Sequence, residues 1–549
     1  MRYTLIGAAL LMTSTVTMAA ADKLVSVGSP AGSFPQNKQN EPSIAVDPLH
    51  PQILAAGANE EIDEAPCNGS DCSFVPGVGN SGIYFSFDGG ASWKQPTYTG
   101  WSARTGTAGV GPIGTLPKYY ESGLVSDGDP VLAFGPRPGA NGHFSWSNGS
   151  RLYYLNLASN FNSSRTDRAF KGFEAIAVSR TDDVAGAAAG SSSAWRAPVI
   201  VSSRMSSTTF SDKDGIWADN AETSPHFGNV YVCWTSFRSI GGAPEPILFS
   251  RSTNGGESWS APDQLTQAAN AATGGRQGCT VRSDSKGVVY VFFEGAAYHS
   301  SAQMMARSFD GGHSFERPQA VAAVTDVGKF DANQADFTID GIGGARTNSY
   351  PSVDIANGAP TGAGATDRIV MGWADARNGL DHEEALVQYS TDGGNTWSEP
   401  VNAADAGDRP NFPALAISPN GASVYLVYEA FLGTWQTTTS NVRSMQGVVR
   451  KAAWPLTTWV TSHRGATGDA RASSANALDS EFLGDYSGVA ATDTFGTAVW
   501  TDVRNAAACA AIDAYRQALT TSSPLPKPAP PTDCPATFGN TEIFSATVP

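Results

Sequence analysis

Charged side chains that could bind a ligand are segregated along the chain. Carboxylates predominate near residues 40–71, 127–129, 212–214 and 481–485, whereas arginines predominate between 276 and 409. A pocket with one acidic half and one basic half would suit a ligand with a carboxylate at one end and hydroxyl groups at the other. The alternative is a set of surface charges and ion pairs within loops, which produces similar patterns.

These residues lie next to predicted strands that recur along the chain. An alternating strand followed by a second apolar strand occurs seven times, at intervals of about sixty to ninety residues. The pairs are 41–48 with 53–58, 129–136 with 151–157, 215–220 with 229–237, 278–284 with 288–295, 350–356 with 368–375, 412–418 with 423–430, and 486–492 with 496–502. Loops before the first strand and after the second would open on one face, where rigid scaffolds carry function.

A second repeated phrase predicts tight turns. It reads Ser-x-Asp/Asn-Gly-Gly-x-Ser/Thr-aromatic at 86–93, 252–259, 308–315 and 390–397. The Asp or Asn side chain can accept hydrogen bonds from the backbone of the turn, and the glycines permit a positive φ. The aromatic residue supplies apolar surface that anchors the turn to its sheet. We therefore assign these phrases a structural role.

The repeated phrases resemble the Asp box, or bacterial neuraminidase repeat, of the sialidase superfamily. Residues 179–183 with 193–195 resemble a split fifth copy, and Trp454 and Trp459 mark an eroded sixth. We predict an all-β chain that forms a single β-propeller of four-stranded blades. The repeat count predicts seven blades, whereas the resemblance implies six, which we keep as a close alternative. The C-terminal tail, 520–549, is expected to close the ring.

The first residues indicate export. A short apolar run after Arg2 ends in small residues before Asp22, which predicts a signal peptide over 1–21 and a propeller domain over 22–549. Six cysteines agree with an oxidising compartment, and we expect Cys67–Cys72 and Cys509–Cys534 to pair. Cys233 and Cys279 could form a bridge or remain buried thiols. The net charge of −16 argues against nucleic acid and anionic membranes as partners.

The resemblance implies a catalytic set. Tyr486 would be the nucleophile, Glu481 its base, and Asp63 or Asp71 the acid/base residue. The substrate carboxylate would be bound by arginines at positions Arg346, Arg377 and Arg409, with Arg276 as a further substrate contact. The family's first-blade arginine is missing here, because Asn40-Glu41-Pro42 occupies that place.

We therefore expect a secreted, monomeric exo-glycoside hydrolase that acts on terminal acidic sugars of extracellular glycans. The alternative is a non-catalytic propeller that binds glycan or protein through the same face. A more distant third hypothesis is a polysaccharide lyase or hydrolase with a carboxylate pair such as Asp129 and Asp214. No cofactor is required and no transition-metal site is predicted. Ca²⁺ could bind at the Asp-x-Asp loops 127–129 and 212–214.

Overall fold

The chain is all-β, as predicted. The computed structural model describes residues 21–161, 168–202, 206–239, 243–267, 276–297, 300–521, 523 and 525–549. Residues 1–20 of the predicted signal peptide lie outside the described residues. Within the described ranges, no helix is long and apolar enough to cross a membrane.

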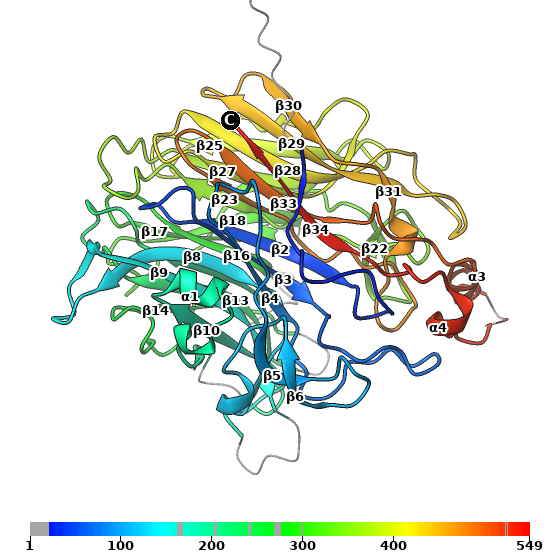
Figure 1. The fold of residues 1–549 in the computed structure, drawn as a ribbon. Helices are drawn as coiled ribbons and strands as arrows, with labels where there is room; N and C mark the ends of the chain where they lie inside the picture. Colours follow the sequence, from blue (N-terminus) through cyan, green and yellow to red (C-terminus); the bar gives the residue numbers. More distant parts are fainter. Residues whose placement is uncertain are drawn as a thin grey trace, which may run out of the picture.

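Seven antiparallel sheets follow one another along the chain (Figure 1). The first three comprise β2 (Gln39–Val46), β3 (Leu54–Glu60) and β4 (Ser81–Ser86); β7 (Leu124–Ser126), β8 (Val131–Pro138), β9 (Phe144–Asn160), β10 (Ala175–Thr181) and β11 (Val199–Ile200); and β12 (Phe210–Ala218), β13 (Val230–Phe237), β14 (Ile247–Ser252) and β15 (Asp263–Gln264). The fourth and fifth comprise β16 (Gln277–Ser283), β17 (Val289–Ala297), β18 (Ser300–Ser308) and β19 (Gln319–Ala323); and β23 (Ser352–Ile355), β24 (Ile369–Asp375), β25 (Glu384–Ser390) and β26 (Val401–Asn402).

The last two sheets contain the sixth and seventh repeats. They comprise β27 (Arg409–Ile417), β28 (Ser423–Phe431), β29 (Ser444–Ala453), β30 (Trp459–Arg464) and β31 (Gly468–Asp469); and β32 (Gly488–Ala491), β33 (Gly496–Asp502), β34 (Glu542–Val548) and β1 (Lys23–Leu24). Smaller elements are β5 (Tyr98–Ser102) with β6 (Gly109–Ile113), β20 (Lys329–Asp331) with β21 (Asp336–Ile339) and β22 (Ala345–Arg346), and the helices α1 (Val184–Ala188), α3 (Ala510–Ala518) and α4 (Pro530–Asp533).

The first strands of these sheets contact one another in cyclic order. The order is β2, β8, β12, β16, β23, β27 and β32, and β32 contacts β2 again. The core lies between neighbouring sheets: Tyr153 and Ile176 of the second sheet pack with Val232 and Trp234 of the third. The N-terminal strand β1 pairs with β34, so both ends of the chain contribute to one sheet.

The four repeated phrases form hydrogen-bonded turns after the third strand of their sheets. Asp310, for example, accepts from the backbone N–H of Ser314 at 2.9 Å and from its hydroxyl at 2.6 Å. In the split copy, Asp183 instead caps α1, while Trp195 remains buried and donates to Tyr98. The split copy therefore retains its buried aromatic residue, although a helix is inserted into its turn.

Three disulfides are present, Cys67–Cys72, Cys233–Cys279 and Cys509–Cys534. The first and third confirm the predicted pairs. The second resolves the alternative that the sequence left open, and it connects β13 of the third sheet to β16 of the fourth.

Replacement of Trp93 tests whether the aromatic residue of the first repeated turn helps to join the first sheet to the seventh. Its ring is buried, and its indole N–H donates to Ser545 in β34 at 2.9 Å. Trp93→Ala should lower the free energy of unfolding by about 3–5 kcal/mol, because it removes a large buried side chain. Urea denaturation measures the effect, with the less buried Trp397→Ala as comparison. Equal stability losses in both variants would contradict a special role for Trp93.

Candidate active site

Residues that enter the first strands have an unusual backbone conformation. Glu41, Asp129 and Lys213 adopt positive φ values of 56°, 52° and 52°. The ladders beside Glu41 and Lys213 shift register between Asn40 and Ser43, and between Asp212 and Gly215. A non-glycine residue in this region is strained, and such strain often accompanies functional sites. The local backbone thus redirects charged side chains at the entrance of several sheets.

These side chains form one ionic network. The Lys213 ammonium lies 3.5 Å from both Asp129 and Asp212 and also contacts Asp485. Arg346 donates to Glu41 at 3.1 Å and to Asp485 at 2.7 Å. Asp485 therefore connects the two cations. Residues from the first, second, third and seventh repeats meet there with Arg346, which precedes the fifth repeat.

A cavity of about 650 Å³, here called the outer pocket, lies beside this network. Five of its lining residues carry carboxyl groups, whereas Lys38 and Arg346 are the basic ones. The carboxyl-bearing residues are Glu41, Glu61, Asp127, Asp129 and Glu174. Its volume is typical of small-molecule sites. The pocket is therefore acidic.

Two of these carboxyl groups form a coupled pair. Burial raises the pKa of Asp127 to about 6, while hydrogen bonds from Ser159 and Glu174 oppose the shift. Burial, followed by the negative charge of Asp127, raises the pKa of Glu174 well above its ordinary value. Like charges this close cannot both ionise easily, so the pair retains a proton near neutral pH. A retained proton in a pocket is what a general acid requires.

Glu41 has the opposite environment in the same pocket. Its carboxylate accepts from Asn59 at 2.6 Å and from the Arg346 guanidinium at 3.1 Å. One pocket thus contains a protonated pair and a cation-bound carboxylate, which is the division of roles used by acid and base residues in catalysis.

A second cavity, of about 460 Å³, is lined by the first strands of all seven sheets. Lys213, Asp485 and Tyr486 line it where those strands begin. The Tyr486 hydroxyl has no hydrogen-bond partner among the described residues. Burial and then the charge of Asp129 raise its pKa well above the usual value, which disfavours the phenolate. Tyr486 lines this second cavity and not the outer pocket.

The other predicted catalytic residues lie elsewhere. Glu481 is buried against Arg443 at 2.6 Å, and burial raises its pKa to about 7. Asp63 is buried and bonds Arg104 at 2.6 Å and Thr115 at 2.7 Å. Asp71 is exposed and bonds Ser73. None of the three lines either cavity, so the structure does not bring the predicted nucleophile, base and acid together.

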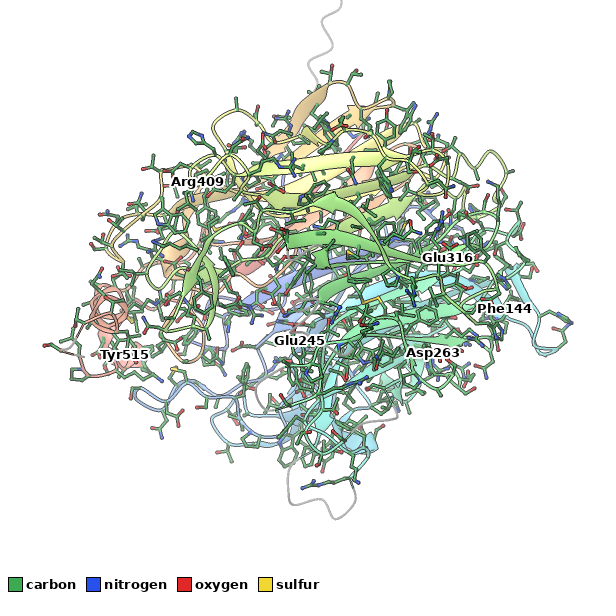
Figure 2. All side chains as sticks on the ribbon, turned by 180° about the vertical axis from the view of Figure 1, so that it is seen from behind. Phe144, Glu245, Asp263, Glu316, Arg409 and Tyr515 are labelled. Carbon is green, nitrogen blue, oxygen red and sulfur yellow. A yellow bond between two sulfur atoms is a disulfide. The ribbon has the colours of Figure 1, made fainter. Side chains whose placement is uncertain are left out.

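The predicted arginine clamp is likewise dispersed. Arg377 is paired with Asp375 at 2.8 Å, and Arg409 is paired with Asp340 at 2.6 Å and with Glu383 at 3.0 Å. Arg276 interacts electrostatically with Glu245, and Figure 2 shows Glu245 well apart from Arg409. Of the four arginines, only Arg346 lines the outer pocket.

The Asp-x-Asp loops that suggested Ca²⁺ contribute to the acidic site. Asp127 and Asp129 line the outer pocket, while Asp212 and Asp129 share the Lys213 ammonium. Within the described ranges, no group of three or more Asp, Glu, His or Cys side chains is arranged as a metal site.

Lys213 and Glu174 are the site residues that sequence reasoning missed. Lys213 lies between Asp212 and Asp214, in a loop for which the sequence analysis indicates only carboxylates. Glu174 directly precedes β10, the third strand of its sheet, where no repeated phrase draws attention to a loop. An isolated lysine within an acidic loop was the one available signal for Lys213.

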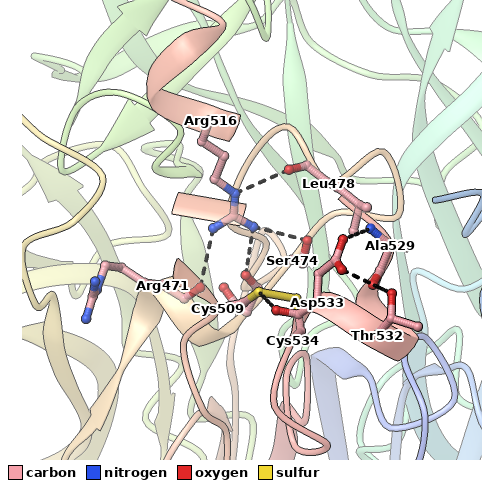
Figure 3. Close-up of a disulfide and its surroundings, with 10 residues drawn as sticks. Arg471, Ser474, Leu478, Cys509, Arg516, Ala529, Thr532, Asp533 and Cys534 are labelled. Carbon is pink, nitrogen blue, oxygen red and sulfur yellow. Dashed lines mark hydrogen bonds between the residues drawn. A yellow bond between two sulfur atoms is a disulfide. The ribbon is translucent and has the colours of Figure 1, made fainter. Parts of the chain in front are cut away.

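The C-terminal helices support one wall of the outer pocket. Arg516 of α3 donates to the carbonyls of Ser473 at 3.0 Å and Ser480 at 2.6 Å. Figure 3 shows its further bonds to Arg471, Ser474 and Leu478. The Cys509–Cys534 disulfide joins the start of α3 to the end of α4. The segment between the two serines contributes residues 475–477 to the pocket. The C-terminal helices thus hold a loop of the site in place.

The acidic network should make stability depend on pH. Burial raises the pKa of both Asp129 and Asp212 to about 7 in the folded protein, so both bind protons that the unfolded chain would release. Stability should therefore fall as pH rises from about 4 through about 7. Asp485, whose pKa is lowered, should act oppositely only below that window.

Lys213→Met should steepen this dependence, because the carboxylates lose their shared cation. Thermal unfolding midpoints of both proteins, measured between about pH 4.5 and about pH 8, test the prediction. Parallel curves for variant and wild type would contradict it.

No protein-family model matches the sequence, and no curated protein is significantly similar to it. Among solved structures, a Trypanosoma rangeli sialidase aligns with 80% of this chain and 58% of its own at 11% identity and a TM-score of 0.37. The phage phi92 endosialidase aligns with 96% of this chain and 69% of its own at 10% identity and a TM-score of 0.40.

A polysaccharide lyase described as an ulvan lyase aligns with 64% of this chain and 78% of its own, at 11% identity and a TM-score of 0.33. This chain therefore spans less than two thirds of the length of the trypanosomal sialidase. TM-scores this low support no argument about function.

Proposed function

We propose that this protein is a secreted glycoside hydrolase built on a seven-bladed β-propeller. Seven successive sheets whose first strands contact one another in a cycle support the blade count. Three disulfides are compatible with export to an oxidising compartment. The observation that carries the activity is the outer pocket, which contains a proton-retaining carboxyl pair and a cation-bound carboxylate.

The roles follow from the two environments. Glu174, or Asp127 through the shared proton, would protonate the glycosidic oxygen as the bond to the leaving group breaks. Glu41 would stabilise the oxocarbenium-like transition state with its negative charge, or orient the attacking water. Arg346 would hold Glu41 in place, because its guanidinium bonds both Glu41 and Asp485.

The same pocket favours a neutral or amino sugar. An anionic sugar would enter a site with five carboxyl groups. The two basic residues of the site, Lys38 and Arg346, are already paired with carboxylates. Arg377 and Arg409, the arginines expected to bind a sugar carboxylate, are engaged elsewhere. The geometry thus supports glycan cleavage better than it supports the specificity for acidic sugars expected from the sequence.

A non-catalytic glycan-binding propeller is the second candidate. It is favoured because Lys213 and Arg346 are each already paired with a carboxylate of the network. Paired charges of this kind are also typical of a network that is structural and not catalytic. In that case the pocket would bind sugar through its amide side chains and leave the bond intact.

Fluorogenic glycosides distinguish the two candidates. We expect release of fluorophore from one or more neutral or amino sugar substrates, most rapidly at mildly acid pH, and weaker or no release from a sialoside. A folded protein that binds neutral oligosaccharides but cleaves no substrate at any pH would favour the binding module. Preferential cleavage of the sialoside would overturn the proposed specificity.

A further inference from the structure

Two phenylalanines line the outer pocket, and they differ in what already covers them. Phe482 lies 4.7 Å from the Lys38 ammonium and 4.7 Å from the Arg346 guanidinium, measured to the ring centroid. Phe74 is 51% exposed, and none of the described ring or cation contacts involves it. Phe74 is therefore an aromatic surface available to a ligand, whereas Phe482 already contacts two cations.

The loop that carries Phe74 is held on both sides. The Cys67–Cys72 disulfide closes the segment before it, and Asp71 accepts from the Ser73 hydroxyl at 2.6 Å. On the other side, the backbone N–H of Val75 donates to the Glu64 carboxylate at 2.8 Å. Because the backbone on both sides is already ordered, a ligand that binds against the Phe74 ring has less loop entropy to overcome.

Polar groups complete the surroundings of this ring. Asn59, Asn80, Asn160 and Asn476 also line the outer pocket. The Asn80 amide oxygen is buried and has no hydrogen-bond partner among the described residues. A pyranose ring has hydroxyl groups, which amide side chains can bond, and a face of C–H groups, which can pack on an aromatic ring. The outer pocket offers both kinds of surface.

We propose that Phe74 is the platform on which one sugar ring of a neutral glycan packs in the outer pocket. The inference deepens the proposed function by naming the side chain that binds the apolar face of the sugar. It requires a glycan ligand, but it does not require that Glu174 be the acid.

Calorimetric binding of cellohexaose, maltohexaose and chitohexaose tests the platform, in a Glu174→Gln background that limits cleavage. Phe74→Ala should weaken binding of the preferred oligosaccharide by about tenfold or more, because the ring contact is lost. Phe74→Trp should retain or improve it. Phe309→Ala, which removes a 61% exposed phenylalanine in a turn remote from the pocket lining, should leave binding unchanged.

The outcomes separate this inference from the proposed function. Unchanged binding in Phe74→Ala, with sugar release by the wild type, overturns the platform and leaves the hydrolase intact. Weakened binding in Phe74→Ala, with full activity in Glu174→Gln, overturns the assigned acid and supports the platform. A wild-type protein that binds none of the three oligosaccharides overturns the platform for neutral glycans.

Discussion

Glu174→Gln is expected to lower turnover by about 10²–10⁴-fold while the protein remains folded. Glutamine has nearly the same shape as glutamic acid but carries no proton that it can transfer at useful pH. The substitution also removes the member of the pair whose pKa is raised well above its ordinary value, which leaves Asp127, with a pKa of about 6, as the remaining acid of the pair. Both effects act on protonation of the leaving group.

Initial rates on the substrate that the wild type cleaves best give the measurement. Glu121→Gln is the matched control, because Glu121 is exposed on the short helix after Tyr119 and lines neither cavity. A dinitrophenyl glycoside adds a sharper test: its leaving group needs little protonation, so the variant should recover much of the lost rate. Equal losses on both kinds of substrate would contradict a role as acid.

The pH profile follows from the same pair. Activity requires the protonated form, so the rate should decline as pH rises through the apparent pKa values of the pair, of which Asp127 contributes one near 6. In Glu174→Gln this alkaline decline should shift to lower pH, because the substitution removes the group with the higher pKa and leaves Asp127, whose pKa is about 6. A merely structural role for Glu174 would not move the profile.

The sequence predicted the strands far better than it predicted the site. Alternation such as Tyr231-Val232-Cys233 places side chains on two faces of a strand regardless of distant partners, and β13 covers that segment. The turn phrases are also local, because their hydrogen bonds link residues four positions apart or fewer. Strands and turns that depend only on neighbouring residues can therefore be predicted from the sequence.

The site depends on partners that are distant in sequence. The sequence predicted Arg409 as a ligand contact, whereas in the fold it pairs with Asp340 and Glu383. Asp485 contacts Lys213, which lies 272 positions earlier in the sequence. Glu174 becomes unusual because the fold buries it and places Asp127 beside it. A charged residue in a loop therefore indicates that a site is near, whereas its role is set by charges that no local pattern records.

Deletion of residues 541–549 should abolish cooperative folding near room temperature. The deletion removes β34, which pairs with β33 on one side and with β1 on the other. Ile543, Phe544 and Val548 are all buried, and each large apolar side chain contributes about 1.5–3 kcal/mol when buried. Their sum approaches the total stability of a typical protein, about 5–15 kcal/mol.

The structural consequence should spread beyond the last sheet, because β33 would keep an unpaired edge and Trp93 would lose Ser545. Circular dichroism melting measures the effect, and a chain lacking only Pro549, which lies beyond β34, is the control. A truncated protein that melts within about 2 °C of the control would contradict closure by this strand. A synthetic peptide of residues 541–549 provides the positive test: if the gap between β33 and β1 is what destabilises the chain, the peptide should add as a strand and restore cooperative melting.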